Sequence, residues 1–121
     1  LRWLGTAGAR LDDLLTWLPC RLVMISLPLV SAPWHRWSAL VRAAEKDGAL
    51  DPSPNAGRSE AIYAHCAGVR LGGRNRYGAT WVEKPLLAAD QPEPNRQAIE
   101  TILKLTIRLQ LFWIVLLGLT Q

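Results

Sequence analysis

The sequence is poor in the residues that build metal clusters, disulfide frameworks and nucleic-acid surfaces. Its 121 residues include two cysteines, two histidines, one methionine and one phenylalanine. Cys20 and Cys66 lie in apolar stretches without metal-ligand spacing, so we interpret them as small buried thiols and not as a disulfide. The net charge of +4 includes no long run of Lys or Arg, which makes nucleic acid an unexpected partner. The first residues also lack the layout of a secretory signal peptide.

Long apolar runs are scarce as well, and two stretches account for them. The first covers residues 14–32 with a single charged residue, close to the ~20 residues that a membrane-spanning helix needs. Pro19 and Pro28 each remove a backbone hydrogen bond, so a kinked or re-entrant helix is an alternative to a simple crossing. Asp12 and Asp13 stand at the expected start of this helix, where carboxylates suit the positive end of the helix dipole.

The second apolar stretch is expected to form a helix over residues 96–119. Its first part carries Glu100, Lys104 and Arg108, which recur every fourth residue and therefore share one helix face. Two interpretations stay open for this face. It is either a salt-bridged stripe whose charged ends reach water, or a cationic stripe that faces an anionic ligand or a polar helix inside the membrane.

The polar region of residues 33–95, between these stretches, holds most of the charged residues. A first helix is predicted over residues 34–47, where apolar residues recur on one face. A second helix should begin at a Ser-Pro pair, run over residues 53–70, and end at Gly72-Gly73.

The rest of the polar region reads as loops. Residues 73–78 are expected to form a tight loop and residues 88–95 a connector, and the signals for β-strands are weak. The pattern therefore predicts an all-α, integral membrane helical fragment, one unit over residues 1–121, with the polar region on the cytoplasmic side. A soluble α domain with both apolar stretches in its core is the alternative.

Three stretches, taken in their order and spacing, carry a resemblance to a known family. Together they resemble the adenosylcobinamide-phosphate synthase family (CobD or CbiB), in its C-terminal part. The stretches are Ala9-Arg10-Leu11-Asp12-Asp13-Leu14 with Pro19 and Arg21-Leu22; Ser53-Pro54-Asn55-Ala56-Gly57 with Glu60-Ala61 and Gly68-Val69-Arg70-Leu71-Gly72-Gly73; and Asn75, Tyr77-Gly78 and Glu83-Lys84-Pro85.

The chain also departs from the family pattern at a few positions. Thr16 stands where the family usually has Asn, and His65 stands in a stretch of small residues. Arg74 replaces a common Pro, and Ala79 and Ala88 replace common glycines.

The resemblance implies a multi-pass enzyme of the cell (inner) membrane that acts in cobalamin biosynthesis. The implied reaction is an ATP-dependent acid–amine ligation, which joins the corrinoid adenosylcobyric acid to aminopropanol phosphate as an amide. The implied cofactors are ATP and Mg²⁺, and the implied partners are both substrates, membrane lipid and the missing N-terminal half of the same protein. Without that half the fragment is expected to be inactive. A carboxylate is a poor electrophile, so it must first be activated, most simply as an acyl phosphate.

That reaction assigns roles to the residues of the three stretches. Asp12 and Asp13 are expected to contact Mg²⁺ or an ammonium group, because hard oxygen ligands suit Mg²⁺. Glu60 is suited to assist deprotonation of the amine, and Lys84 to hold phosphate; these four are the expected catalytic residues. Residues expected to bind substrate or phosphate are Arg10, Arg21, Ser53, Asn55, Gly57, Arg70, Gly72, Gly73, Asn75 and Tyr77.

Purely structural interpretations stand beside these roles. The aspartate pair can be a solvated pair at a helix start, Ser53 and Asn55 can cap a helix, and Gly72-Gly73 can end one. His65 is interpreted as a core or interface residue. At the level of function, a non-catalytic membrane scaffold or sensor derived from the same fold is the alternative to the enzyme.

Overall fold

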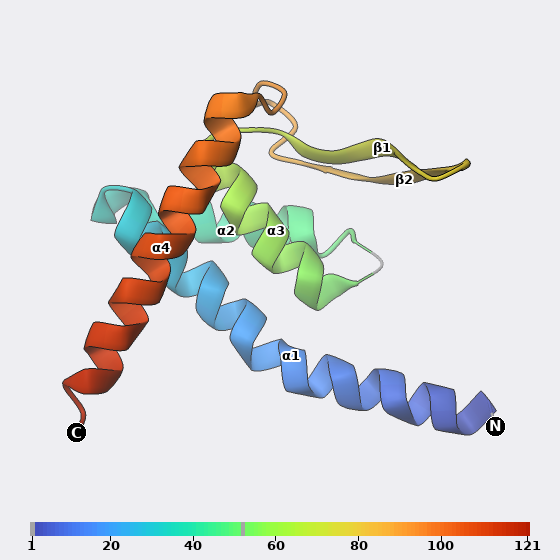
Figure 1. The fold of residues 1–121 in the computed structure, drawn as a ribbon, viewed down its shortest axis with the longest axis horizontal. Helices are drawn as coiled ribbons and strands as arrows, with labels where there is room; N and C mark the ends of the chain where they lie inside the picture. Colours follow the sequence, from blue (N-terminus) through green and yellow to red (C-terminus); the bar gives the residue numbers. More distant parts are fainter. Residues whose placement is uncertain (1, 52) are drawn as a thin grey trace.

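The computed structural model describes residues 2–51 and 53–121 of the chain. This part forms four α-helices, one short 3-10 helix and a two-stranded hairpin, and Figure 1 shows how the labelled helices and strands are arranged. In chain order they are α1 (Arg2–Ser31), η1 (Trp34–Arg36), α2 (Trp37–Gly48), α3 (Pro54–Ala67), β1 (Leu71–Tyr77), β2 (Thr80–Leu87) and α4 (Arg96–Gly118).

The hydrophobic core lies where the C-terminal half of α1 meets α2, α3 and α4. Leu27 of α1, Ile62 of α3 and Leu87 at the end of β2 are almost fully buried there. The N-terminal half of α1 and the hairpin both extend away from this core toward the same side of the molecule (Figure 1). The core cluster consists of Met24, Leu27, Leu40, Ala44, Ala61, Ile62, Ala64, Leu87, Ala88, Leu105 and Leu109.

The first apolar helix is longer than the sequence indicates. We predicted a helix over residues 14–32, whereas α1 runs without a break from Arg2 to Ser31 and contains both Pro19 and Pro28. The aspartate pair therefore lies about three turns inside the helix, and its assignment to the positive end of the helix dipole is wrong.

Both long helices present apolar side chains to their surroundings. Trp3 and Leu14 of α1 are 70% and 71% exposed, and Ile114 of α4 is 66% exposed. By length and composition, α1 and α4 are the two helices of the described residues that are able to cross a membrane. These surfaces fit a membrane protein, and the bounds of α4 agree with the helix predicted over residues 96–119.

The hairpin corrects the prediction of an all-α fold. β1 and β2 pair antiparallel, with Gly73 opposite Lys84, and an irregularity in register falls between Leu71 and Gly73. Residues 73–78, predicted as a tight loop, therefore belong mostly to β1. The physical reason lies in the glycines: Gly72 and Gly73 have φ of 84° and 81°, which lets the strand bulge.

The helix predicted over residues 53–70 ends earlier, because Gly68 takes over the role expected of Gly72-Gly73. Gly68 follows the last residue of α3 in the left-handed conformation, with φ 70°. Its amide donates to the carbonyl of Ala64, as is common at the C-terminal end of a helix. The chain then turns directly into β1.

A carboxylate on α2 ties the end of the hairpin to the helical core. One Oδ of Asp47 accepts hydrogen bonds from the backbone amide of Ala88 at 3.0 Å and lies 2.7 Å from Nε2 of His65. Ala88 has φ 54°, a conformation that favours glycine. The prediction of an interface role for His65 is confirmed by this contact between α2 and α3.

Candidate functional site

The side chain of Asn55 joins the middle of α1 to the first turn of α3. Its Nδ2 donates to the backbone carbonyl of Asp13 at 2.8 Å and to Oγ1 of Thr16 at 3.2 Å. Its Oδ1 accepts from the Arg21 guanidinium at 2.9 Å. Asn55 is 9% exposed, and both its amide nitrogen and its amide oxygen form hydrogen bonds to other residues of the protein. Two of the three family-like stretches, forty residues apart in sequence, therefore meet at one side chain.

Arg21 is held from two directions at this junction. Besides its hydrogen bond to Asn55, its guanidinium carbon lies 4.6 Å from the ring centroid of Trp17, one turn earlier in α1. A guanidinium over an indole face is attracted by the ring electrons. The stacking and the hydrogen bond together fix the direction of the Arg21 side chain.

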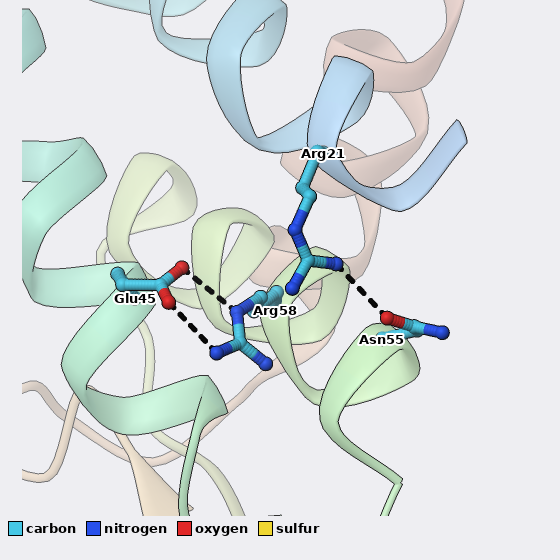
Figure 2. Close-up of polar contacts among 4 residues, drawn as sticks. All are labelled: Arg21, Glu45, Asn55 and Arg58. Atoms are coloured by element: carbon cyan, nitrogen blue, oxygen red, sulfur yellow. Dashed lines mark hydrogen bonds and ion pairs between the residues drawn. The ribbon is translucent and has the colours of Figure 1, made fainter. Parts of the chain in front are cut away.

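An ion pair lies beside this contact (Figure 2). Nε and one terminal nitrogen of Arg58 donate to the two carboxylate oxygens of Glu45, at 2.8 Å and 2.7 Å, and thereby connect α3 to α2. These hydrogen bonds hold the pKa of the Glu45 carboxyl below its ordinary value; the charges of Arg58 and Arg21 act in the same direction, while partial burial opposes them. The guanidinium of Arg21 and that of Arg58 thus come from different helices to the neighbourhood of one carboxylate (Figure 2).

Gly48 and Gly57 allow α2 and α3 to approach closely enough for this pair to form. A Cβ on Gly48 would lie 2.6 Å from Cα of Arg58, and a Cβ on Gly57 would lie 2.6 Å from the carbonyl oxygen of Gly48. We expected Gly57 to let a ligand approach the backbone, but Gly48 and Asp51 fill that space. The structure gives Gly57 a packing role.

A pocket opens along α1 next to Asn55. It has a volume of about 340 Å³ and is lined by Arg10, Asp13, Leu14, Trp17 and Asn55. The four residues of α1 fall on one face of the helix, and Asn55 faces them from α3. Three of the predicted site residues (Arg10, Asp13 and Asn55) therefore share this pocket, and a fourth, Arg21, bonds to its wall.

The remaining predicted residues of the first two stretches lie outside this pocket lining. Asp12 and Glu60 are both solvent-exposed, and Ser53 precedes α3 without a side-chain capping bond. The amide of Ser53 instead bonds to Oδ1 of Asp51 at 2.8 Å.

The end of the second stretch lines a separate polar hollow beside the hairpin. This pocket, of about 530 Å³, is lined by residues that include Arg70, Gly72 and Gly73. Arg70 forms an ion pair with Glu93 across it, at 2.7 Å. Lys84 pairs through its backbone with Gly73, while the side chains of Asn75 and Tyr77 lie outside the described part of the structure. The two groups of predicted residues thus line different pockets.

Asp12 and Asp13 are the residues that the sequence analysis expects to contact Mg²⁺. Across residues 2–51 and 53–121, no group of three His, Cys, Asp or Glu side chains comes together as a metal cage. Asp12 and Asp13 follow one another on a helix, where neighbouring side chains point in different directions. A Mg²⁺ ion at this place would therefore have one carboxylate of the pair as a ligand and would need phosphate oxygens and water as its other ligands.

Sequence reasoning missed several residues that the fold brings to this junction. Thr16 accepts a hydrogen bond from Asn55, and Glu45 and Arg58 pair next to Arg21. The spacing of Asp13, Trp17 and Arg21 indicates that these three residues share one face of the helix. Glu45 and Arg58 gave no such indication, because their pairing depends on the close packing of α2 against α3.

The profile of the CobD/Cbib protein family matches residues 1–106. "Cobalamin biosynthesis protein CobD" of Synechocystis sp. is 47% identical over 97% of this chain and 33% of its own length. The protein of the same name from Yersinia enterocolitica is 34% identical over 99% of this chain and 38% of its own length. The chain thus spans about a third of the length of these relatives, and no solved structure matches it.

Proposed function

Because the chain belongs to the CobD/Cbib protein family, we propose that it is the C-terminal part of an adenosylcobinamide-phosphate synthase of cobalamin biosynthesis. This enzyme joins the carboxylate of a corrinoid acid to the amine of aminopropanol phosphate and uses ATP to activate the carboxylate. The relatives that match most of the chain are named as cobalamin biosynthesis proteins, which supports the pathway. The two helices of membrane-crossing length support a membrane protein, and we place it in the inner membrane with its polar region on the cytoplasmic side as part of the proposal.

The observation that carries the proposal is the Asn55 bridge. It brings the Asp13 and Arg21 segment of α1 against the Ser53-Asn55 turn of α3, so that a carboxylate and two arginines gather at one polar junction on a long apolar helix. Amide formation from an activated carboxylate needs cations against phosphate charge and groups that orient the amine. The junction supplies groups of both charges in one place.

ATP and Mg²⁺ belong to the proposal as co-substrate and cofactor. Bound Mg²⁺ neutralises the charge of the reacting phosphates. Asp13 is the residue of this chain best placed to share in holding the ion, because its side chain lines the pocket. Arg10 lines the same pocket and supplies a positive charge for phosphate oxygens.

The test is amide formation by the complete protein in detergent, with ATP, Mg²⁺, adenosylcobyric acid and aminopropanol phosphate. Cobinamide phosphate should appear only when all four are present. Replacing Arg21 with Met, which keeps length but removes the charge and the bond to Asn55, should lower kcat/KM by at least about tenfold. The matched control is Arg42→Met, since Arg42 is an exposed arginine of α2.

Two results would oppose the proposal. Formation of the amide without ATP would remove the ligase assignment. Failure of the complete protein to restore cobalamin synthesis in cells blocked at this step, despite normal insertion in the membrane, would favour a non-catalytic scaffold or sensor of the same fold.

A further inference from the structure

The helix α1 carries a continuous apolar face. From Leu11 onward, leucine or isoleucine recurs after alternating steps of four and three residues, and residues at such steps share one side of a helix. We call this side the leucine face; it consists of Leu4, Leu11, Leu15, Leu18, Leu22, Ile25 and Leu29. Its members other than Leu22 are 42–66% exposed, so the described residues 2–51 and 53–121 leave most of this face uncovered.

The charged residues of α1 lie away from the centre of the leucine face. They are Arg2, Asp12 and Asp13 on the opposite half of the helix, and Arg10 and Arg21 at one border of the face. α3 packs against the polar half, where Asn55 donates a hydrogen bond to the carbonyl of Asp13. The helix is therefore amphipathic along most of its 30 residues.

The other elements are arranged on the same two sides of α1. Figure 1 shows α3 and the hairpin on one side of α1 and the C-terminal half of α4 on the other. α3 carries Arg58, which pairs with Glu45 of α2, whereas residues 109–119 contain no charged residue. Leu111 and Ile114 in that part of α4 are 56% and 66% exposed. The leucine face and the apolar end of α4 thus both point away from α3.

We infer that α1 lies in the plane of the membrane surface and contacts phospholipid acyl chains with its leucine face. Its polar half, with α3 packed on it, then faces water. A helix in this position buries its apolar face roughly 5–10 Å below the headgroup level. If α1 instead crossed the bilayer, its exposed Asp12 and Asp13 would lie in hydrocarbon, where charged groups are costly. This orientation goes beyond the proposed function and does not rest on the reaction.

The width and composition of the leucine face favour lipid over a second helix. A helical partner covers a narrow seam of about two residues in seven, flanked by charged residues that pair across it. Here Leu14, which is 71% exposed, lies beside the seam and widens it, and Pro19 stands at a flanking position. Contacts between helices in membranes are also enriched in small residues, whereas this face consists of leucine and isoleucine alone. Acyl chains fit such a broad surface of branched side chains.

Spin labels on the leucine face measure its depth in a bilayer. Both native cysteines of the chain are replaced by serine, and the complete protein is labelled singly after Leu4→Cys, Leu11→Cys, Leu18→Cys or Ile25→Cys. These positions follow one another every seven residues on one line of the helix. The protein is placed in nanodiscs of phosphatidylcholine and phosphatidylglycerol. Relaxation by oxygen and by a water-soluble nickel chelate, calibrated with spin-labelled lipids, gives the depth of each label.

All four labels should lie at one shallow depth, roughly 5–10 Å below the headgroups. A crossing helix advances about 10 Å in seven residues, so its labels at Leu4 and Ile25 would differ in depth by about 30 Å. A steady change of depth along the series would therefore overturn the inference. The matched control is Ala9→Cys, an exposed position on the polar half, two residues from Leu11. Its label should be accessible to the nickel chelate, whereas on a crossing helix it would lie nearly as deep as the label at Leu11.

The same measurement detects a protein partner. Protection of the labels from both oxygen and the nickel chelate would show that the face is covered by the rest of the protein or by a second copy, and would overturn the inference. Each labelled variant should unfold at the denaturant concentration of the wild type, and Leu15→Cys or Leu29→Cys on the same face replaces any variant that does not. These results are independent of amide formation, so the orientation of α1 and the proposed function can fail separately.

Discussion

Replacing Asn55 with Ala should separate α3 from the middle of α1. The substitution removes two donated hydrogen bonds, to the carbonyl of Asp13 and the hydroxyl of Thr16, and one accepted bond from the Arg21 guanidinium. A neutral hydrogen bond contributes about 1 kcal/mol net and one to a charged group about 1.5–3 kcal/mol. Because these effects are not additive and water can reach half-buried Arg21, we expect a loss of about 2–3 kcal/mol in the free energy of unfolding.

A second asparagine of the chain provides the matched comparison. Asn95 caps α4, and its side chain accepts one hydrogen bond from the amide of Ala98 at 2.8 Å. Asn95→Ala should therefore cost about 1 kcal/mol and leave amide formation intact. Asn55→Ala should cost more and should also reduce amide formation, because it releases Arg21 and the wall of the pocket.

Denaturant unfolding of the complete protein in detergent, followed by tryptophan fluorescence, measures both losses, and the coupled amide assay measures activity. Asn55→Asp adds a further check. It keeps an acceptor for Arg21 but places an oxygen against the carbonyl of Asp13, so it should also destabilise the protein. Equal or smaller destabilisation by Asn55→Ala than by Asn95→Ala, or full activity of Asn55→Ala, would refute the bridge as the element that holds the site.

Three further predictions concern the surroundings of the site. Because Arg58 lowers the folded-state pKa of Glu45 below the ordinary 4.5, the pair stabilises the fold above that pH and this contribution is lost as pH falls through the folded pKa. Glu45 is half-exposed, so the ion pair should contribute only about 0.2–1 kcal/mol to the free energy of unfolding. Between about pH 6 and pH 3, the free energy of unfolding of Glu45→Gln should therefore fall by that much less than the free energy of unfolding of the wild type. Gly72→Ala should unfold the hairpin, since the added Cβ would overlap the carbonyl oxygen of Pro85 and the left-handed backbone costs roughly 1–2 kcal/mol more; protease cleavage between the strands reports this, and resistance equal to the wild type would contradict it. Burial raises the pKa of the Cys66 thiol, so its alkylation near pH 8 (roughly the range of free thiols) should be slower than in the denatured chain, and equal rates would show that the thiol is not shielded.

The helical part of the fold was largely accessible from the sequence. Apolar periodicity located α2 and α4 to within a few residues, and the Ser-Pro pair located the start of α3. Each of these elements has a local cause, either an apolar stripe or a residue that suits a helix start. The N-terminal extension of α1 was missed because residues 2–13 contain no long apolar run and because the aspartate pair was interpreted as the start of the helix.

The hairpin was missed because the local sequence preferences of residues 71–87 do not indicate that two strands pair. Gly72, Gly73 and Gly78 are read as a helix stop and a loop when considered singly. Their positive φ values instead permit a bulge and a turn, and the partner strand lies several residues further on. Strand pairing of this kind depends on contacts that no local window contains.

The candidate site could likewise be predicted only in part from the sequence. The residue types in the family-like stretches singled out Asp13, Arg21 and Asn55, and the structure brings these three together. Which aspartate faces the pocket follows from the rotation of α1 against α3, and the sequence does not contain that rotation. The ion pair between Glu45 and Arg58 likewise requires the tight glycine contact between helices.

The bridge at Asn55 also constrains immersion in lipid. Two groups that share a hydrogen bond lie at nearly the same depth in a bilayer. The first turn of α3 must therefore lie at the depth of the middle of α1. If residues 14–31 crossed the hydrocarbon region as a straight helix, α3 and the Arg58–Glu45 pair would also lie within the membrane. In that case the polar region is not a free loop outside the bilayer, because its second α-helix, α3, lies at the depth of the middle of α1.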